Sequence, residues 1–231
     1  LADLNQPITP PVSMGWNLRR KHEHFSHYQT LANALCKHID LDPFYLSTYF
    51  DRCQNVNFLT QQGLDCLKTH CQRLLDTLQK EYTQRKITTK PYLVIKSDHG
   101  TYGYATFCLE TIEQLDTLNR KTRVKMTAGK NRINSHSFLI QEGIESYHRC
   151  AQGASAEPCL YHIGHQIIGG FFRTHPKQSS RSNLNTPGMS FIPFTTDSPF
   201  CSLSLQVASQ LANLAAAHEM QTTPNLVENA Y

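Results

Sequence analysis

The residues with the clearest chemical potential lie in the run Tyr92-Leu-Val-Ile-Lys-Ser-Asp-His-Gly-Thr-Tyr-Gly-Tyr-Ala105. Lys96 closes an apolar segment typical of a buried strand, so its ammonium group would emerge at the end of a sheet, beside a phosphate. Gly100 and Gly103 allow backbone amides of the following loop to converge on an anion. The run matches neither the Walker A nor the G-x-G-x-x-G spacing, so a β-hairpin with a glycine turn is the alternative interpretation.

Two later segments also carry polar side chains that could bind a ligand. Gln141 and Glu142 close another apolar run, as a hinge that reads an adenine would. Glu157 and Arg173 stand on opposite limbs of a predicted hairpin, where a surface ion pair is the alternative to a functional pair. Each of these signals is weak when taken alone.

Two further regions offer groups for anions. Asn183 and Asn185 lie in a polar loop that suits a phosphate or a carboxylate, although most such loops are only turns. The cations Arg19, Arg20 and Lys21 could bind a substrate carboxylate, or they could form a solvated helix start. Cations at the start of a helix oppose its dipole, which favours a functional reason for them.

Composition narrows the classes of protein. The chain has 231 residues, 39% of them hydrophobic, enough for one large domain or two small ones, and a formal charge of +4 that suits a nucleotide site or a weak nucleic-acid patch. Its eight cysteines form no C-x-x-C pair, and its histidines lack a matching set of ligands, so reduced cytosolic thiols and packing histidines are expected. No signal peptide or membrane-spanning run is present, so a cytoplasmic location is expected.

Hydrophobic periodicity outlines the elements that would position these groups. Helices are expected over 19–39, 64–82 and 203–218, a short helix over 111–118, and strands over 91–96, 104–109, 138–141, 159–163 and 166–173. Residues 119–134 have weak periodicity and are predicted to be a mobile, solvated segment. Helices followed by a strand-rich half indicate an α+β protein.

Several short blocks, taken together in chain order, resemble one family. Met14-Gly-Trp-Asn-Leu-Arg-Arg-Lys-His-Glu-His-Phe25 and the Lys96–Gly103 loop are similar to blocks of the proteobacterial type of glutamate–cysteine ligase. The resemblance covers nearly the whole chain, although the loop ends in Gly103-Tyr-Ala105 where the family has Gly-Met-Gly. The further matching blocks are Leu118-Asn-Arg-Lys, Ile140-Gln-Glu-Gly, Ala156-Glu-Pro, Gly169-Gly-Phe-Phe-Arg173 and Asn183-Leu-Asn-Thr-Pro-Gly-Met189.

The resemblance implies an ATP-grasp-like fold, in which two mixed α/β lobes clamp ATP. It implies a helical segment over residues 1–90, joined to an amino-terminal region that lies outside this chain, and a nucleotide-binding and catalytic region over 91–231. It also implies ATP and Mg²⁺ as cofactors. The residues expected to bind nucleotide are Lys96, Ser97, Asp98, Gly100, Thr101, Tyr102, Gly103, Gln141 and Glu142; those expected in catalysis are Arg173, Asn183 and Asn185, with Glu157 for the metal and Arg19, Arg20 and Lys21 for substrate.

The implied reaction is the ATP-dependent joining of the γ-carboxyl group of glutamate to the amine of cysteine, through an acyl-phosphate, in glutathione biosynthesis. Small-molecule substrates are expected as partners, without nucleic acid or membrane. The alternatives are an ATP-grasp ligase of other amino-acid specificity, which alternative amines would reveal, and a degenerate module that binds ATP without turnover. The sequence leaves open the oligomeric state, the contacts to cysteine and the activity of this chain alone.

Overall fold

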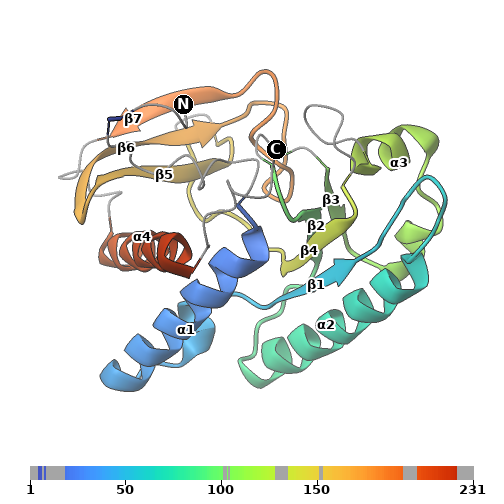
Figure 1. Cartoon of the computed structure of the whole chain (residues 1–231), viewed down its shortest axis with the longest axis horizontal. Helices are drawn as coiled ribbons and strands as arrows, with labels where there is room; N and C mark the ends of the chain where they lie inside the picture. Colours follow the sequence, from blue (N-terminus) through green and yellow to red (C-terminus); the bar gives the residue numbers. More distant parts are fainter. Residues whose placement is uncertain are drawn as a thin grey trace.

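The computed structural model describes residues 5, 6, 8, 19–100, 103, 105–127, 135–150, 153–194 and 202–222. These residues form an α+β fold in which two separate antiparallel sheets are flanked by helices (Figure 1). The elements are α1 (Lys21–Ile39), β1 (Phe50–Gln54), α2 (Leu64–Gln84), β2 (Leu93–Ser97), β3 (Thr106–Leu109), α3 (Arg120–Thr127), β4 (Ser137–Glu142), β5 (Ala156–Ile163), β6 (Gln166–Thr174), β7 (Ser190–Phe194) and α4 (Leu203–Thr222), with short 3₁₀ helices at Pro43–Tyr45 and Ile112–Leu115.

The first sheet has the strand order β1-β4-β2-β3, so β2 lies between β4 and β3. Side chains of a strand alternate between its two faces. Leu93 and Ile95 are therefore buried on the face that α2 covers, whereas Val94 and Lys96 point to the other face. This alternation presents the predicted lysine on the side of the sheet away from α2.

Helix α2 supplies the cover of this sheet. The predicted apolar side of the helix is confirmed, because Leu67, Cys71, Leu74 and Leu78 are buried in one hydrophobic cluster with β1, β2 and β4. The same cluster contains residues from both sides of position 90, where the sequence suggested a division. The two regions proposed from the sequence thus share a core in the described chain.

The second sheet has the order β5-β6-β7. The predicted hairpin is confirmed: β5 and β6 pair around a turn at Gly164, where φ is +58°. Strand β7 was not expected, since its run Ser-Phe-Ile-Pro-Phe lacks alternation. Pro193 cannot donate a ladder hydrogen bond and is tolerated because β7 lies at the edge of the sheet.

The two helices α1 and α4 pack against each other, and α4 runs along the second sheet (Figure 1). Asn213 of α4 donates to the carbonyl of Gly164 at 2.6 Å, which attaches the helix to the β5–β6 turn. The first residues of α1 point toward the region where the two sheets approach each other (Figure 1).

One prediction was wrong. Residues 120–127 form helix α3, although the segment 119–134 was expected to be mobile and solvated. The side chain of Asn119 accepts hydrogen bonds from the backbone N–H of Thr122 at 2.9 Å and caps the helix. Met126 is fully buried and anchors the helix to the core, and residues 128–134 lie outside the described chain. Strand β1 was not predicted either, because its five residues include three polar ones.

Candidate active site

A cavity of about 420 Å³ opens where β2 and β3 of the first sheet meet the start of α1 and the second sheet. Seven residues singled out from the sequence line it, and they come from segments as far apart as α1 and the loop after β6. The lining residues are Lys21, Tyr92, Val94, Lys96, Gly100, Gly103, Thr106, Cys108, Ile144, Glu157, Arg173, Ser180, Arg181, Ser182 and Asn183.

The floor of the cavity at one end is mostly apolar. Tyr92, Val94 and Cys108 share the exposed face of β2 and β3, because Val94 stands directly opposite Cys108 in the sheet register. Ile144 also lines the cavity, and the Arg181 guanidinium lies 5.0 Å from the Tyr92 ring centre. This end suits a flat, weakly polar group that can stack on the ring and the guanidinium.

Lys96 contributes a partly buried cation to the cavity. It stands next to the end of β2, as predicted, and its Nζ lies 5.3 Å from the centre of the Phe25 ring of α1. Burial lowers the pKa of Lys96 to about 8, because few polar groups replace the water around its ammonium. An anion bound beside Lys96 would supply the missing charge partner.

Lys21 holds the loop that follows β2. Its Nζ donates to the backbone carbonyls of Ser97 at 2.7 Å, His99 at 3.0 Å and Gly100 at 2.9 Å. Burial, together with the nearby charge of Lys96, lowers the pKa of Lys21 to about 8. Lys21 therefore fixes the backbone of the loop through these three hydrogen bonds, and it also lines the cavity.

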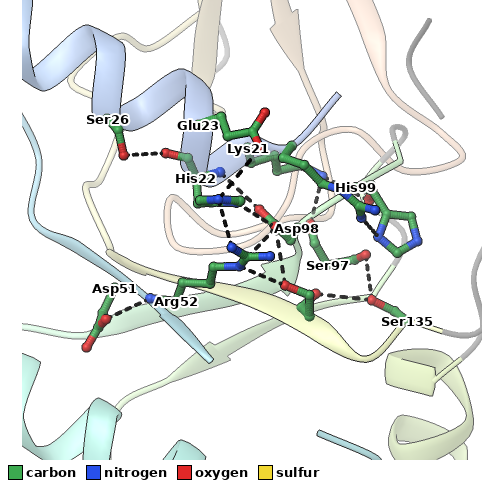
Figure 2. A network of polar contacts seen from close by, with 12 residues as sticks. Lys21, His22, Glu23, Ser26, Asp51, Arg52, Ser97, Asp98, His99 and Ser135 are labelled. Atoms are coloured by element: carbon green, nitrogen blue, oxygen red, sulfur yellow. Dashed lines mark hydrogen bonds and ion pairs between the residues drawn. The ribbon is translucent and has the colours of Figure 1, made fainter. Parts of the chain in front are cut away.

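Asp98 anchors the same loop to the start of α1 and Arg52 (Figure 2). It is not among the residues that line the cavity. Its carboxylate is fully buried and accepts hydrogen bonds from the backbone N–H of His22 at 2.9 Å and from His22 Nδ1 at 2.7 Å. Arg52 donates to Nε2 of the same histidine at 2.9 Å. Ser97 likewise turns away from the cavity and bonds Ser135 at 2.7 Å. Both residues therefore position the loop.

The two arginines before α1 have separate partners. Arg19 donates twice to the carboxylate of Glu219 on α4, each time at 2.8 Å, and His24 contacts the same carboxylate. Arg20 lies 3.0 Å from Nδ1 of His99. Burial and the neighbouring cations Arg20 and Lys21 lower the pKa of His99, so a neutral ring accepts this hydrogen bond.

Glu157 and Arg173 stand directly opposite each other on β5 and β6. Arg173 donates from Nε at 3.1 Å and from Nη2 at 2.8 Å, both times to Oε2 of Glu157. Both residues line the cavity, so the second sheet contributes this ion pair to the same cavity that Lys96 lines from the first sheet. The predicted pair therefore exists, and it is part of the cavity rather than of an isolated surface.

Asn183 joins the loop after β2 to the loop after β6. Its Oδ1 accepts a hydrogen bond from the backbone N–H of Asn185 at 2.9 Å, which orients the amide. Gly103 has φ +67°, and its Cα lies against that amide so closely that a Cβ would be 1.8 Å from Nδ2. Asn183 lines the cavity, whereas Asn185 does not.

The remaining predicted residues lie farther out. Gln141 stands opposite Val94 and thus shares the cavity face of the sheet, one strand away from the floor. Glu142 is buried on the other face, where it accepts hydrogen bonds from the Tyr82 hydroxyl at 2.9 Å and the Tyr49 N–H at 3.3 Å. Thr101 and Tyr102 lie outside the described residues.

Sequence reasoning did not identify Tyr92 or Arg181 as parts of the site. Tyr92 could have been found from strand alternation, since it lies two and four residues before Val94 and Lys96. Arg181 is held over Tyr92 by Glu145 at 2.6 Å and Glu110 at 3.2 Å, and no local pattern signals such a link.

The fold and the cavity define an α+β protein whose cavity is lined by apolar and aromatic side chains together with the cations Lys21, Lys96, Arg173 and Arg181. A family model for glutamate–cysteine ligase matches residues 1–220, and the chain belongs to this family. A crystal structure from Methylobacillus flagellatus KT, provisionally described as a gamma-glutamylcysteine synthetase, is similar, with 29% identity and a TM-score of 0.82. The similarity covers 96% of this chain and 55% of that protein, so this chain spans about half of its length.

A comparison of the sequence with curated proteins found no match. In the described part of the chain, every helix is too short or too polar to cross a membrane. Among the described residues, the thiols of Cys36, Cys53, Cys66, Cys71, Cys108 and Cys159 are free.

Proposed function

We propose that the protein containing this chain joins the γ-carboxyl group of glutamate to the amine of cysteine, with ATP bound in the cavity. The observation that carries this proposal is that Lys96 of β2, Arg173 of β6 and Asn183 of the loop after β6 line one cavity. Membership of the glutamate–cysteine ligase family supports the same reaction. The two sheets would then act as the lobes of an ATP-grasp-like clamp.

The polarity of the cavity suggests how ATP lies in it. Adenine would occupy the end formed by Tyr92, Val94, Cys108 and Ile144, with Gln141 close to its edge. The triphosphate would extend toward Lys96 and Arg173, since charged groups in a cavity shielded from water interact strongly with anions. The volume of about 420 Å³ falls in the range of sites for small molecules.

The reaction needs two balanced steps. An oxygen of the glutamate γ-carboxylate attacks the γ-phosphorus of ATP, ADP leaves, and an acyl-phosphate forms. The amine of cysteine then attacks the acyl carbon, the amide bond forms, and phosphate departs as the nitrogen loses a proton. Arg173 and Lys96 would neutralise charge on the transferred phosphoryl group, and the Asn183 amide would donate to its oxygens.

The cavity fits a Mg²⁺ ion in the presence of nucleotide. Mg²⁺ in such sites is held by one or two carboxylates together with phosphate oxygens. Glu157 supplies a carboxylate in the lining, and both contacts from Arg173 go to Oε2, which leaves Oε1 for an ion. When bound, Mg²⁺ would neutralise phosphate charge.

The substrate amino acids are expected near the start of α1. Arg19 is occupied by Glu219 and Lys21 by three carbonyls, whereas Arg20 contacts the neutral ring of His99. Arg20 is therefore the member of the trio best suited to bind a substrate carboxylate.

The test is detection of γ-glutamylcysteine by mass spectrometry after the native-length protein receives ATP, Mg²⁺, glutamate and cysteine. Product should require all four, and Lys96→Ala and Arg173→Ala should each lower kcat/KM by about 100-fold or more. Lys37→Ala, an exposed position on α1, is the control and should leave the rate unchanged. Undiminished ligation in both cavity variants would refute the site. Binding of ATP without product would favour another acceptor amine or a module without turnover.

A further inference from the structure

A cluster of metal-ligand side chains lies on the far side of the first sheet, outside the cavity. The sulfurs of Cys53 and Cys66 and a ring nitrogen of His70 all lie within 4.8 Å of one another. Cys53 comes from β1, whereas Cys66 and His70 lie one turn apart on α2. None of the three lines the cavity described above.

The spacing of the two sulfurs matches a tetrahedral ion. Cys53 Sγ and Cys66 Sγ are 3.7 Å apart. Two sulfurs bound to Zn²⁺ at about 2.3 Å in a tetrahedron would be separated by about 3.8 Å. The separation is too long for a disulfide bond, and a small ion fits between the sulfurs without movement of the backbone.

The histidine is held by a carboxylate, as metal-bound histidines commonly are. Nδ1 of His70 lies 2.7 Å from Oδ2 of Asp51, which is also bound by Arg73. A carboxylate on one ring nitrogen fixes the imidazole and leaves the other nitrogen, Nε2, for a metal. Asp51 precedes Cys53 by two residues on β1, so strand alternation directs both side chains to the same face.

Burial and access also suit a resident ion. Cys53 is 2% exposed and packs in the hydrophobic core, whereas Cys66 is exposed on the surface of α2. The site is therefore shielded on the strand side and reachable from solvent on the helix side. Two thiolates and an imidazole are a soft donor set, which selects Zn²⁺ over Mg²⁺.

We propose that Cys53, Cys66 and His70 form a binding site for a thiophilic divalent cation such as Zn²⁺, with Asp51 orienting the histidine. Both thiols lose their protons to solvent when the ion binds, and a water molecule completes four-fold coordination. The ion ties β1, an edge strand, to the first turns of α2. This site is independent of the proposed ligase activity.

The experiment titrates the reduced, metal-free protein with Zn²⁺ against a chromophoric chelator, and with Co²⁺ as a spectroscopic probe. The unaltered protein should bind one equivalent, and the Co²⁺ form should show thiolate charge-transfer absorption and the intense visible bands of tetrahedral geometry. Cys66→Ser and His70→Gln should each abolish the tetrahedral spectrum. Asp51→Asn should weaken binding by about 10- to 100-fold.

Matched controls separate this site from adventitious binding. Cys159→Ser, on β5, and His38→Gln, exposed on α1, should bind as the unaltered protein does. Circular dichroism of each variant checks that it is folded. Equal Zn²⁺ affinity in all variants would overturn the proposal, as would no uptake by the reduced protein. Formation of a Cys53–Cys66 disulfide under oxidant, with no metal uptake after reduction, would also overturn it.

Discussion

Gly103 and Asn183 are packed so closely that any side chain at position 103 would collide with the asparagine amide, because a Cβ there would lie 1.8 Å from Nδ2. The contact joins two loops that are eighty residues apart in sequence. Since the colliding atom ends a flexible side chain, a Gly103→Ala variant can fold by displacing the amide. The glycine therefore determines where Asn183 points.

Gly103→Ala should lower kcat/KM for ligation by about 100-fold, the effect of losing one oriented donor. Its free energy of unfolding should fall by only about 1 kcal/mol, the cost of a side chain in the left-handed region. Gly164→Ala is the control, because Gly164 has φ +58° and nothing within 4 Å of the added Cβ. Steady-state kinetics measure kcat/KM of the Gly103→Ala and Gly164→Ala variants, and chemical denaturation measures their unfolding free energies. Equal kinetic effects of the two substitutions would remove the proposed role of Asn183.

Lys21→Met should loosen the loop after β2, because three carbonyls lose their shared donor. The expected cost is about 1–3 kcal/mol of unfolding free energy. Hydrogen exchange of residues 97–100 should become faster and KM for ATP should rise. The exposed Lys37→Met variant on the same helix should change none of these values. Unaltered exchange in Lys21→Met would show that the loop does not depend on this lysine.

The affinity for ATP should fall as pH rises above about 8. Burial lowers the pKa of Lys96 to about 8, so its ammonium is charged below that pH and neutral above it. A polyanion binds the charged form, so binding above pH 8 requires uptake of a proton and weakens by up to about tenfold per pH unit. Calorimetric titrations between pH 7 and 9.5 measure this slope.

Lys96→Arg keeps its charge over that range and should give a shallower slope, although Lys21, also with a pKa of about 8, still contributes. An identical slope in the variant would exclude Lys96 as a group that titrates with ATP binding.

Glu219→Gln should weaken the attachment of α4 to α1. Burial raises the pKa of Glu219, but hydrogen bonds from His24 and Arg19 outweigh it, so the pKa lies below its ordinary value of 4.5. Since the folded-state pKa is depressed, this group stabilises the fold above pH 4.5 and loses that effect as pH falls through the folded value. The variant should be less stable by about 1–3 kcal/mol at pH 7.

Urea denaturation of both proteins at pH 7 and at lower pH checks the sign. The difference in unfolding free energy between the unaltered protein and Glu219→Gln should become smaller as the pH is lowered. Glu23 is half-exposed on α1, so Glu23→Gln should unfold with nearly the same free energy as the unaltered protein at either pH. A larger difference in unfolding free energy at low pH would contradict the stabilising role of the ionised Glu219 carboxylate.

Local patterns predicted much of the fold and part of the site. The apolar run that Lys96 closes marks β2, and the spacing of Leu67, Cys71, Leu74 and Leu78 marks one face of α2. Such periodicities survive folding because each face meets a single environment. Lys96, Gly103 and Arg173 were accordingly placed on elements that the structure contains.

Links between distant segments could not be predicted. Arg19 and Glu219 are 200 residues apart, and the local sequence around either residue does not indicate that the two side chains meet. The buried position of Asp98 has the same origin, because it depends on His22 of α1. The helix over 120–127 was missed because its stability comes from the Asn119 cap and one buried methionine rather than from a periodic apolar face.

The contact between α1 and α4 also constrains the order in which the molecule can assemble during synthesis. Helix α1 is synthesised well before its partner helix, because Glu219 follows the end of α1 by about 180 residues. Strand β1 likewise waits for β4, some 85 residues downstream, before any ladder hydrogen bond can form. The nascent chain must therefore keep these surfaces unpaired until the later segments are made, the interval in which chaperones act on exposed apolar segments.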